Sequence, residues 1–270
     1  MMAHRHWLTA IVLGALAFAT PVLAQKSAHY KDKEKESPID PLKPTGRSAL
    51  RQTVQGLCVR NWLDHHNPAP CERVVLVEQK TGSAGYAVIA DEGGGAHYLL
   101  VPTQTMTDLN SGELLDADTP NYFAQAWHSR DALNKFVGHE IPRNAIGLAM
   151  GIARFSPQDQ FHIHMECLRP EIAKALRVSA ADMQATWAPL VLEGSTYQAM
   201  QVMSEDLSAT NPFEVLATLN ADARHHMADY TLVVAGMQFK SGPGFVLLAG
   251  TGPSGELMLD STCGGTIGGT

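Results

Sequence analysis

The sequence is poor in basic residues, since its 20 lysines and arginines are outnumbered by 27 aspartates and glutamates. The formal net charge is −7, and such a chain is a poor candidate for binding a nucleic-acid backbone, which requires clustered lysine and arginine. We therefore expect no nucleic-acid partner. An anionic substrate would have to be held by a local group of hydrogen-bond donors rather than by the field of the whole chain.

Long hydrophobic runs are also scarce. The run near the N-terminus, residues 8–19, is shorter than the roughly 20 residues of a transmembrane helix. It follows a weakly basic start and precedes Pro21-Val22-Leu23-Ala24, which resembles a signal-peptide cleavage site. We predict export with cleavage, and a retained N-terminal anchor is the alternative. The predicted division of the chain is an export signal, a charged and proline-containing disordered spacer, a folded domain and a flexible tail, at residues 1–24, 25–47, 48–263 and 264–270.

Cysteine is limited to four residues, an even number that predicts disulfides in an exported chain. Their spacing fits no zinc-knuckle pattern. Four cysteines allow three pairings. Because Cys58 and Cys71 can close a short loop that contains proline, we favour this pair, which leaves Cys167 with Cys263.

Two pairs of β-rich segments predict hairpins. Residues 85–91 and 97–102 are joined by a glycine triplet, which lacks the lysine and the strand-to-helix context of a phosphate-binding loop and therefore predicts a plain turn. Residues 230–236 and 244–250 form the second pair. The two hairpins resemble one another, so residues 190–263 could be a second half-domain that arose by duplication. Generic hairpin composition explains the likeness equally well.

Helix signals do not alternate regularly with the predicted strands. An apolar strand is predicted at residues 145–153, directly before a strand that carries histidines. Helical spacing or helix-start signals occur at residues 48–63, at Thr119-Pro120 with an apolar stripe that runs to Phe136, at Arg169-Pro170, at Ser179-x-x-Asp182 and at Asn211-Pro212. Antiparallel hairpins and this irregular order predict an α+β fold with a mostly antiparallel sheet.

The segment from Gln160 to Cys167 alternates polar and apolar residues, which is the period of a half-buried strand. Side chains two residues apart on a strand share a face. We therefore expect Gln160, His162 and His164 on one face, and Phe161, Ile163 and Met165 on the other.

Two parallel imidazoles allow three interpretations. One histidine can attack phosphorus as a nucleophile if its other ring nitrogen is oriented by a hydrogen bond. The pair can instead provide two ligands of a metal site, or it can fill a pocket without any chemistry. A metal would need a third ligand, for which nothing in the sequence selects among His65, His66, His97, His128, His225 and His226.

The surrounding motifs carry a family resemblance. The alternation at Gln160-Phe-His162-Ile-His164-Met is similar to the histidine-triad motif. The chain also resembles the bacterial CDP-diacylglycerol pyrophosphatases from about residue 50 to residue 263. This likeness rests on Cys71, Cys167 and, in order, Gly85-Tyr-Ala-Val-Ile, Tyr98-Leu-Leu-Val-Pro-Thr103, Thr119-Pro-Asn-Tyr-Phe, Ala126-Trp127-x3-Asp131 and Phe161-His-Ile-His-x3-Leu-Arg-Pro170.

The resemblance implies hydrolysis of CDP-diacylglycerol to CMP and phosphatidate at the outer face of the inner membrane, through a nucleotidyl-histidine and without a metal or other cofactor. It implies helices on one side of the sheet and places His162 at the nucleophile position and His164 at the third triad position. His164 and Gln160 would hold phosphate oxygens, and Gln158 and Asp159 could contact phosphate.

Two features depart from the superfamily pattern. Gln160 replaces the first triad histidine, and Met150-Gly151 stands where an asparagine is usual. Two alternatives therefore stay open. The chain could be a hydrolase or transferase of another nucleoside diphosphate substrate, or an exported lipid- or nucleotide-binding protein without activity.

Overall fold

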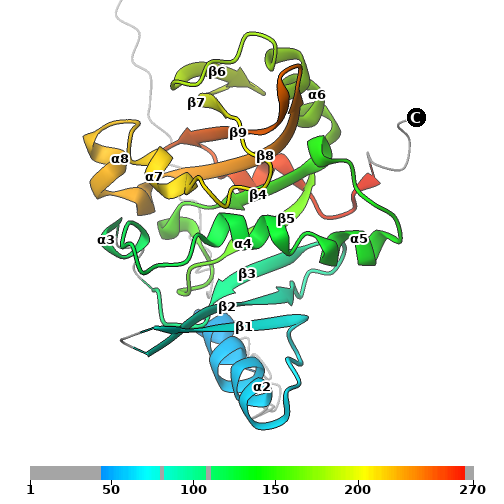
Figure 1. The fold of residues 1–270 in the computed structure, drawn as a ribbon, viewed down its shortest axis with the longest axis vertical. Helices are drawn as coiled ribbons and strands as arrows, with labels where there is room; N and C mark the ends of the chain where they lie inside the picture. Colours follow the sequence, from blue (N-terminus) through cyan, green and yellow to red (C-terminus); the bar gives the residue numbers. More distant parts are fainter. Residues whose placement is uncertain (1–43, 80–81, 108–110, 265–270) are drawn as a thin grey trace, which may run out of the picture. The chain divides into compact units, whose positions relative to one another are not determined.

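A computed structural model describes residues 44–79, 82–107 and 111–264, which fall in one compact unit. Its strands form a ten-stranded antiparallel sheet with the order β1-β2-β3-β5-β4-β8-β9-β7-β6, and β10 pairs with β5 (Figure 1). The predicted α+β class with a mostly antiparallel sheet is confirmed. The strands are β1 Arg73–Gln79, β2 Gly82–Ala90, β3 Tyr98–Pro102, β4 Ile146–Met150, β5 Ile163–Leu168, β6 Ala188–Leu192, β7 Ser195–Val202, β8 Thr231–Phe239, β9 Gly242–Gly250 and β10 Leu259–Asp260.

The helices are short. A π-helical segment, η1 Val54–Val59, joins the first two α-helices. No helix within the described ranges is long and apolar enough to cross a membrane. The helices are α1 Ala49–Thr53, α2 Arg60–His65, α3 Ser111–Leu114, α4 Tyr122–His128, α5 Asp131–Val137, α6 Pro170–Ser179, α7 Pro212–Leu216 and α8 Ala221–His225, and a 3₁₀ turn, η5, spans Gly255–Met258.

Helices cover both faces of the sheet, so the expectation of helices on one side is wrong. The helices α4, α5, α7 and α8 contribute to the core cluster that contains Leu148 and Ile163. On the opposite face, α6 packs with residues of β7, β8 and β9, while α1 and η1 pack on β1, β2 and β3. The part of this second face over β5 therefore lies between two separate apolar clusters, and polar side chains can occupy it.

The strand order repeats within the chain. The hairpin β2–β3, a helical segment and the hairpin β4–β5 give the order β2-β3-β5-β4, and the later strands give the order β6-β7-β9-β8. The two halves meet where β4 pairs antiparallel with β8, with Leu148 opposite Val234. In this order, β8 and β9 of the second half correspond to β4 and β5 of the first half. The sequence likeness is instead between the hairpins β8–β9 and β2–β3, so it does not follow the repeat of the strand order.

Several local predictions agree with the structure. Helical structure runs from α1 to α2, both predicted hairpins are present, and Pro170 and Pro212 stand in the first turns of α6 and α7. The glycine triplet forms a turn in which Gly94 and Gly95 have positive φ angles of 75° and 81°. A side chain at Gly95 would also collide with the carbonyl oxygen of Ser261.

Other helix predictions were wrong in detail. The helix expected at Thr119-Pro120 begins at Tyr122, because the side chain of Asn121 caps it by accepting a hydrogen bond from the Ala124 amide. Phe136, the last residue of the predicted apolar stripe, is exposed. No helix follows Ser179-x-x-Asp182, where the Asp182 amide donates to the Ser179 carbonyl in a turn.

The structure pairs Cys58 with Cys71 and Cys167 with Cys263, the pairing that we favoured from the sequence. The first disulfide joins η1 to the segment before β1. The second joins β5 to the C-terminal segment, at a sequence separation of 96 residues against 13 for the first. It therefore fixes the C-terminal segment beside β5.

Replacing each disulfide by two alanines should reveal this difference. Loop-closure entropy grows with the logarithm of the number of residues enclosed, so loss of Cys167–Cys263 should lower the free energy of unfolding by about 2 kcal/mol more than loss of Cys58–Cys71. Urea denaturation of the two double variants measures the difference. A larger loss for Cys58→Ala/Cys71→Ala would contradict this expectation.

Candidate active site

The two histidines of the β5 segment lie side by side, as the alternation predicts. Their ring centroids are 4.9 Å apart, with the rings inclined at 60°. Phe161, Ile163 and Met165 are buried in the main core cluster on the other face. The hydrogen-bonded strand begins only at Ile163, so His162 belongs to the extended residues just before it.

One ring nitrogen of His162, Nδ1, has a clear hydrogen-bond partner. Its Nδ1 lies 2.8 Å from the main-chain carbonyl oxygen of Gln160, and because a carbonyl only accepts, Nδ1 carries the proton. Burial, followed by the nearby positive charge of His164, lowers the pKa of His162 to about 4. The ring is therefore neutral near pH 7, and its Nε2 keeps a free lone pair.

Gln160 acts on the backbone around it. Its Nε2 donates to the carbonyl oxygens of Gln104 at 2.8 Å and Pro102 at 3.3 Å, and its Oε1 accepts from the Met106 amide at 3.2 Å. The side chain is 2% exposed. The amide would have to give up one of these bonds to touch a ligand, so its predicted contact with phosphate stays a prediction. Its backbone carbonyl is what orients His162.

His164 lies in a chain of close polar contacts that starts and ends at carboxylates. Asp91 Oδ2 is 3.3 Å from His97 Nδ1, His97 Nε2 is 2.8 Å from His164 Nδ1, and His164 Nε2 is 3.2 Å from Glu256 Oε1. Burial, followed by the nearby His164, lowers the pKa of His97, while Asp91 and Glu256 oppose this shift.

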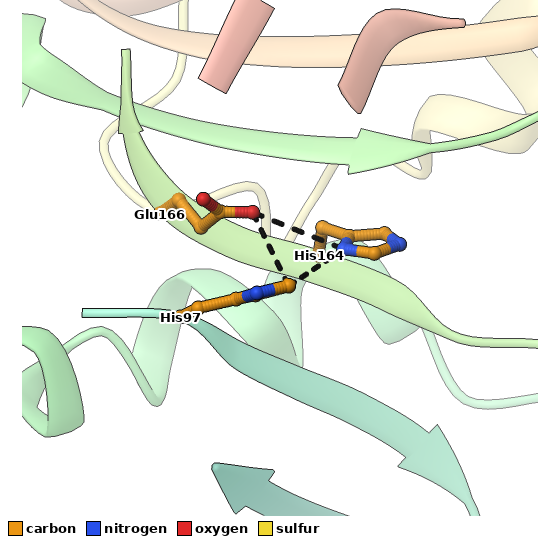
Figure 2. Close-up of side chains that lie close together, drawn as sticks. All are labelled: His97, His164 and Glu166. Atoms are coloured by element: carbon orange, nitrogen blue, oxygen red, sulfur yellow. Dashed lines mark hydrogen bonds and ion pairs between the residues drawn. The ribbon is translucent and has the colours of Figure 1, made fainter. Parts of the chain in front are cut away.

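A third carboxylate, Glu166, closes this group from the same face of β5 (Figure 2). Its Oε1 lies 3.2 Å from His97 Nε2 and 3.8 Å from His164 Nδ1. Glu166 is buried, and burial raises its pKa to about 7 despite the opposing charge of His164. The residue follows His162 and His164 at the same two-residue interval, so the alternation that identified the histidines could have identified it too.

A pocket that is open to solvent lies beside His162. It brings together the predicted residues Gln158, Gln160 and His162 with Arg47 and Glu256, whereas His164 is not among its lining residues. The Oε1 of Gln158 accepts from a backbone amide of α1. Arg47, which lies at the end of the predicted spacer, donates to the Ser156 carbonyl of the pocket wall, so the folded part begins before residue 48.

Glu256 reaches the site because the chain around η5 is anchored to the sheet. The Gly255 amide donates to Thr231 Oγ1 at 2.7 Å, and Thr231 Oγ1 donates to the Met150 carbonyl at 2.7 Å. A Cβ atom at Gly151 would lie 2.1 Å from Glu256 Oε1. Glycine at position 151 therefore leaves the space that the Glu256 carboxylate occupies.

Of the six histidines that could have completed a metal set, the structure brings His97 to His164. His128 and His226 instead contact Asp206 and Asp222 on exposed surface. Sequence reasoning missed Asp91 and Glu256 altogether. Asp91 and His97 flank the turn between β2 and β3, and a hairpin prediction places them close together without showing what they face.

The protonation of His162 gives a test by NMR. We expect this imidazole to stay neutral, with its proton on Nδ1, from pH 8 down to about pH 5, because burial disfavours the charged ring. Protonation is then easier in the unfolded chain, so this residue lowers stability as the pH falls from 6.5 toward about 4. Long-range ¹H–¹⁵N spectra of histidine-labelled protein measure the tautomer, and a titration of His162 near pH 6.5 would contradict the expectation.

A comparison with protein families identifies the family of the chain. The family model for CDP-diacylglycerol pyrophosphatase (CDH) matches residues 45–265, which is most of the chain and includes every site residue described above. Members of this family are hydrolases that act on a phosphoric anhydride bond. The chain belongs to the CDP-diacylglycerol pyrophosphatase family.

Proposed function

We propose that the protein hydrolyses CDP-diacylglycerol to CMP and phosphatidate with His162 as the nucleophile. One observation carries this proposal. The Nδ1 proton of His162 is held by the Gln160 carbonyl, which leaves Nε2 as an unprotonated nucleophile in a ring that lines the pocket. Because the pKa of His162 is lowered to about 4, Nε2 stays unprotonated near neutral pH.

The reaction then has two displacements at the same phosphorus. His162 Nε2 forms a bond to the cytidine-side phosphorus while the bond to the bridging oxygen breaks, and phosphatidate leaves with the electron pair. Water next attacks the nucleotidyl-histidine, the P–N bond breaks, and its electrons return to Nε2. Glu256 lines the same pocket and can accept the proton that the water loses.

Local donors can offset the charge of the pyrophosphate in this acidic chain. Arg47 lines the pocket, and the ring of His164 lies beside that of His162. A phosphate oxygen that approached His164 Nε2 would replace the Glu256 carboxylate as the acceptor. We propose Gln158 and Gln160 as further contacts for the substrate, through the side of the pocket that they line.

Two residues that are neighbours in sequence of pocket-lining residues have exposed apolar side chains. Phe155, between Ala153 and Ser156 in the sequence, is 66% exposed, and Leu257, which follows Glu256, is 63% exposed. Large apolar side chains at the rim of a polar site suit a substrate with acyl chains. The two disulfides are typical of an oxidising compartment. We therefore propose action on lipid at the periplasmic face of the inner membrane.

Substitution of the nucleophile provides the first test. His162→Ala should lower CMP release from CDP-diacylglycerol in mixed micelles by roughly 10³-fold or more, because the covalent route is lost. His128→Ala, an exposed histidine on α4, is the matched control and should keep full activity. Circular dichroism verifies that both variants are folded, and acid quenching of the wild-type reaction should trap an acid-labile nucleotidyl-protein.

The same experiment separates the alternatives. A His162→Ala variant with more than a few per cent of activity would exclude the nucleophile role. Stoichiometric substrate binding without CMP release by the wild-type protein would indicate a binding protein. Equal turnover of soluble nucleotide-sugar diphosphates would indicate a broader hydrolase.

The apolar rim gives a second prediction. Phe155→Ala/Leu257→Ala should raise the KM for long-chain CDP-diacylglycerol by about tenfold, since two large side chains leave the lipid contact. Turnover of a water-soluble short-chain analogue should change little. Val178→Ala/Val191→Ala, on exposed positions of α6 and β6, is the control and should change neither. Equal effects on both substrates would argue against a lipid-binding rim.

A further inference from the structure

We propose that His97, His164 and Glu166 form a binding site for a divalent cation of the Zn²⁺ class, beside the nucleophile but separate from it. Figure 2 shows the three side chains converging from β5 and from the residue before β3. The proposed cation takes no part in the attack by His162. The inference stands on the geometry of these three residues and does not depend on the reaction proposed above.

The three ligand atoms have the spacing of a metal set. The distances are 2.8 Å between His97 Nε2 and His164 Nδ1, 3.2 Å between His97 Nε2 and Glu166 Oε1, and 3.8 Å between His164 Nδ1 and Glu166 Oε1. Ligand atoms of a tetrahedral zinc centre with bonds near 2.05 Å are about 3.3 Å apart. Shifts of a few tenths of an ångström would therefore seat the ion, which would replace the direct contact between the two rings.

The donor set selects the class of ion. Two imidazoles and one carboxylate are a familiar zinc set that leaves a fourth position for water. Calcium and magnesium instead favour sites made mostly of oxygen ligands. The ligands are also well held, because Glu166 and His164 are paired residues of β5 and Glu166 is 6% exposed.

The surroundings match the outer shell of a metal site. Histidine ligands usually donate their second ring N–H to a carboxylate or carbonyl, which fixes the ring and turns the other nitrogen toward the metal. Here His97 Nδ1 faces Asp91 at 3.3 Å, and His164 Nε2 faces Glu256 at 3.2 Å. Both imidazoles thus already have carboxylates on the side away from the proposed ion.

The balance of charge also favours a cation. Three carboxylates, those of Asp91, Glu166 and Glu256, lie around two imidazoles in a small volume. A divalent ion would offset the negative charge of those carboxylates that are ionised. Asp91 and Glu256 keep about a third of their side-chain surface exposed, so an ion can reach the site from solvent.

Metal binding to the folded, disulfide-bonded protein tests the proposal. After chelator treatment and its removal, titration with Zn²⁺ by calorimetry should give one site per chain, and Co²⁺ should give the visible absorption of a tetrahedral site. Glu166→Gln and His97→Gln should weaken Zn²⁺ binding at least 100-fold, and Asp91→Asn by about 10- to 100-fold as an outer-shell change. His226→Ala, an exposed histidine paired with Asp222, is the control and should bind normally.

The His162→Ala variant separates this inference from the proposed reaction, because it should still bind one Zn²⁺ while releasing no CMP. No stoichiometric binding by the wild-type protein would overturn the proposal. Unchanged affinity in both Glu166→Gln and His97→Gln, each verified as folded by circular dichroism, would overturn it equally. Loss of the site in His226→Ala would assign the ion to the surface instead.

Discussion

Successive side chains of the extended segment that leads into β5 must point to opposite faces of the sheet, and both the core and the site depend on this constraint. Phe161, Ile163 and Met165 pack in the main core cluster, which α4 also joins. His162 and Glu166 point to the other face. A register slip of one residue would place these ionisable groups in the apolar core, where unpaired charges are costly. The core therefore specifies the position of the chemistry.

The two histidines share a face but have opposite environments. Burial, followed by the nearby His164, lowers the pKa of His162, whereas the hydrogen bond to the Gln160 carbonyl orients the ring and opposes that shift. His164, two residues later, lies between His97 and Glu256. Burial and a local hydrogen bond act on the first ring, and carboxylates from distant segments act on the second. One extended segment thus places two imidazoles with different partners at 4.9 Å between ring centroids.

Sequence patterns that span only a few residues correctly predicted several strands and helix starts. Alternation predicted β5, and proline after a capping residue predicted α6 and α7, because strand pleat and helix capping act over a few residues. The strands β6 and β7 were missed because they are half exposed and only partly alternate, and β1 was missed although its sequence is rich in valine. The capping-box signal at Ser179 failed because the chain turns instead toward β6, which pairs with β7.

The sequence by itself determined the pair of histidines, their shared face, the favoured cysteine pairing and the resemblance to a pyrophosphatase family. Each of these depends on spacing along one segment or on a simple count. Only the tertiary structure selected His97 from six candidate histidines and placed Glu256 against His164. The physical reason is distance along the chain. These contacts join strands β3 and β5 and the η5 turn through packing, hydrogen bonds and a disulfide, and no local periodicity encodes them.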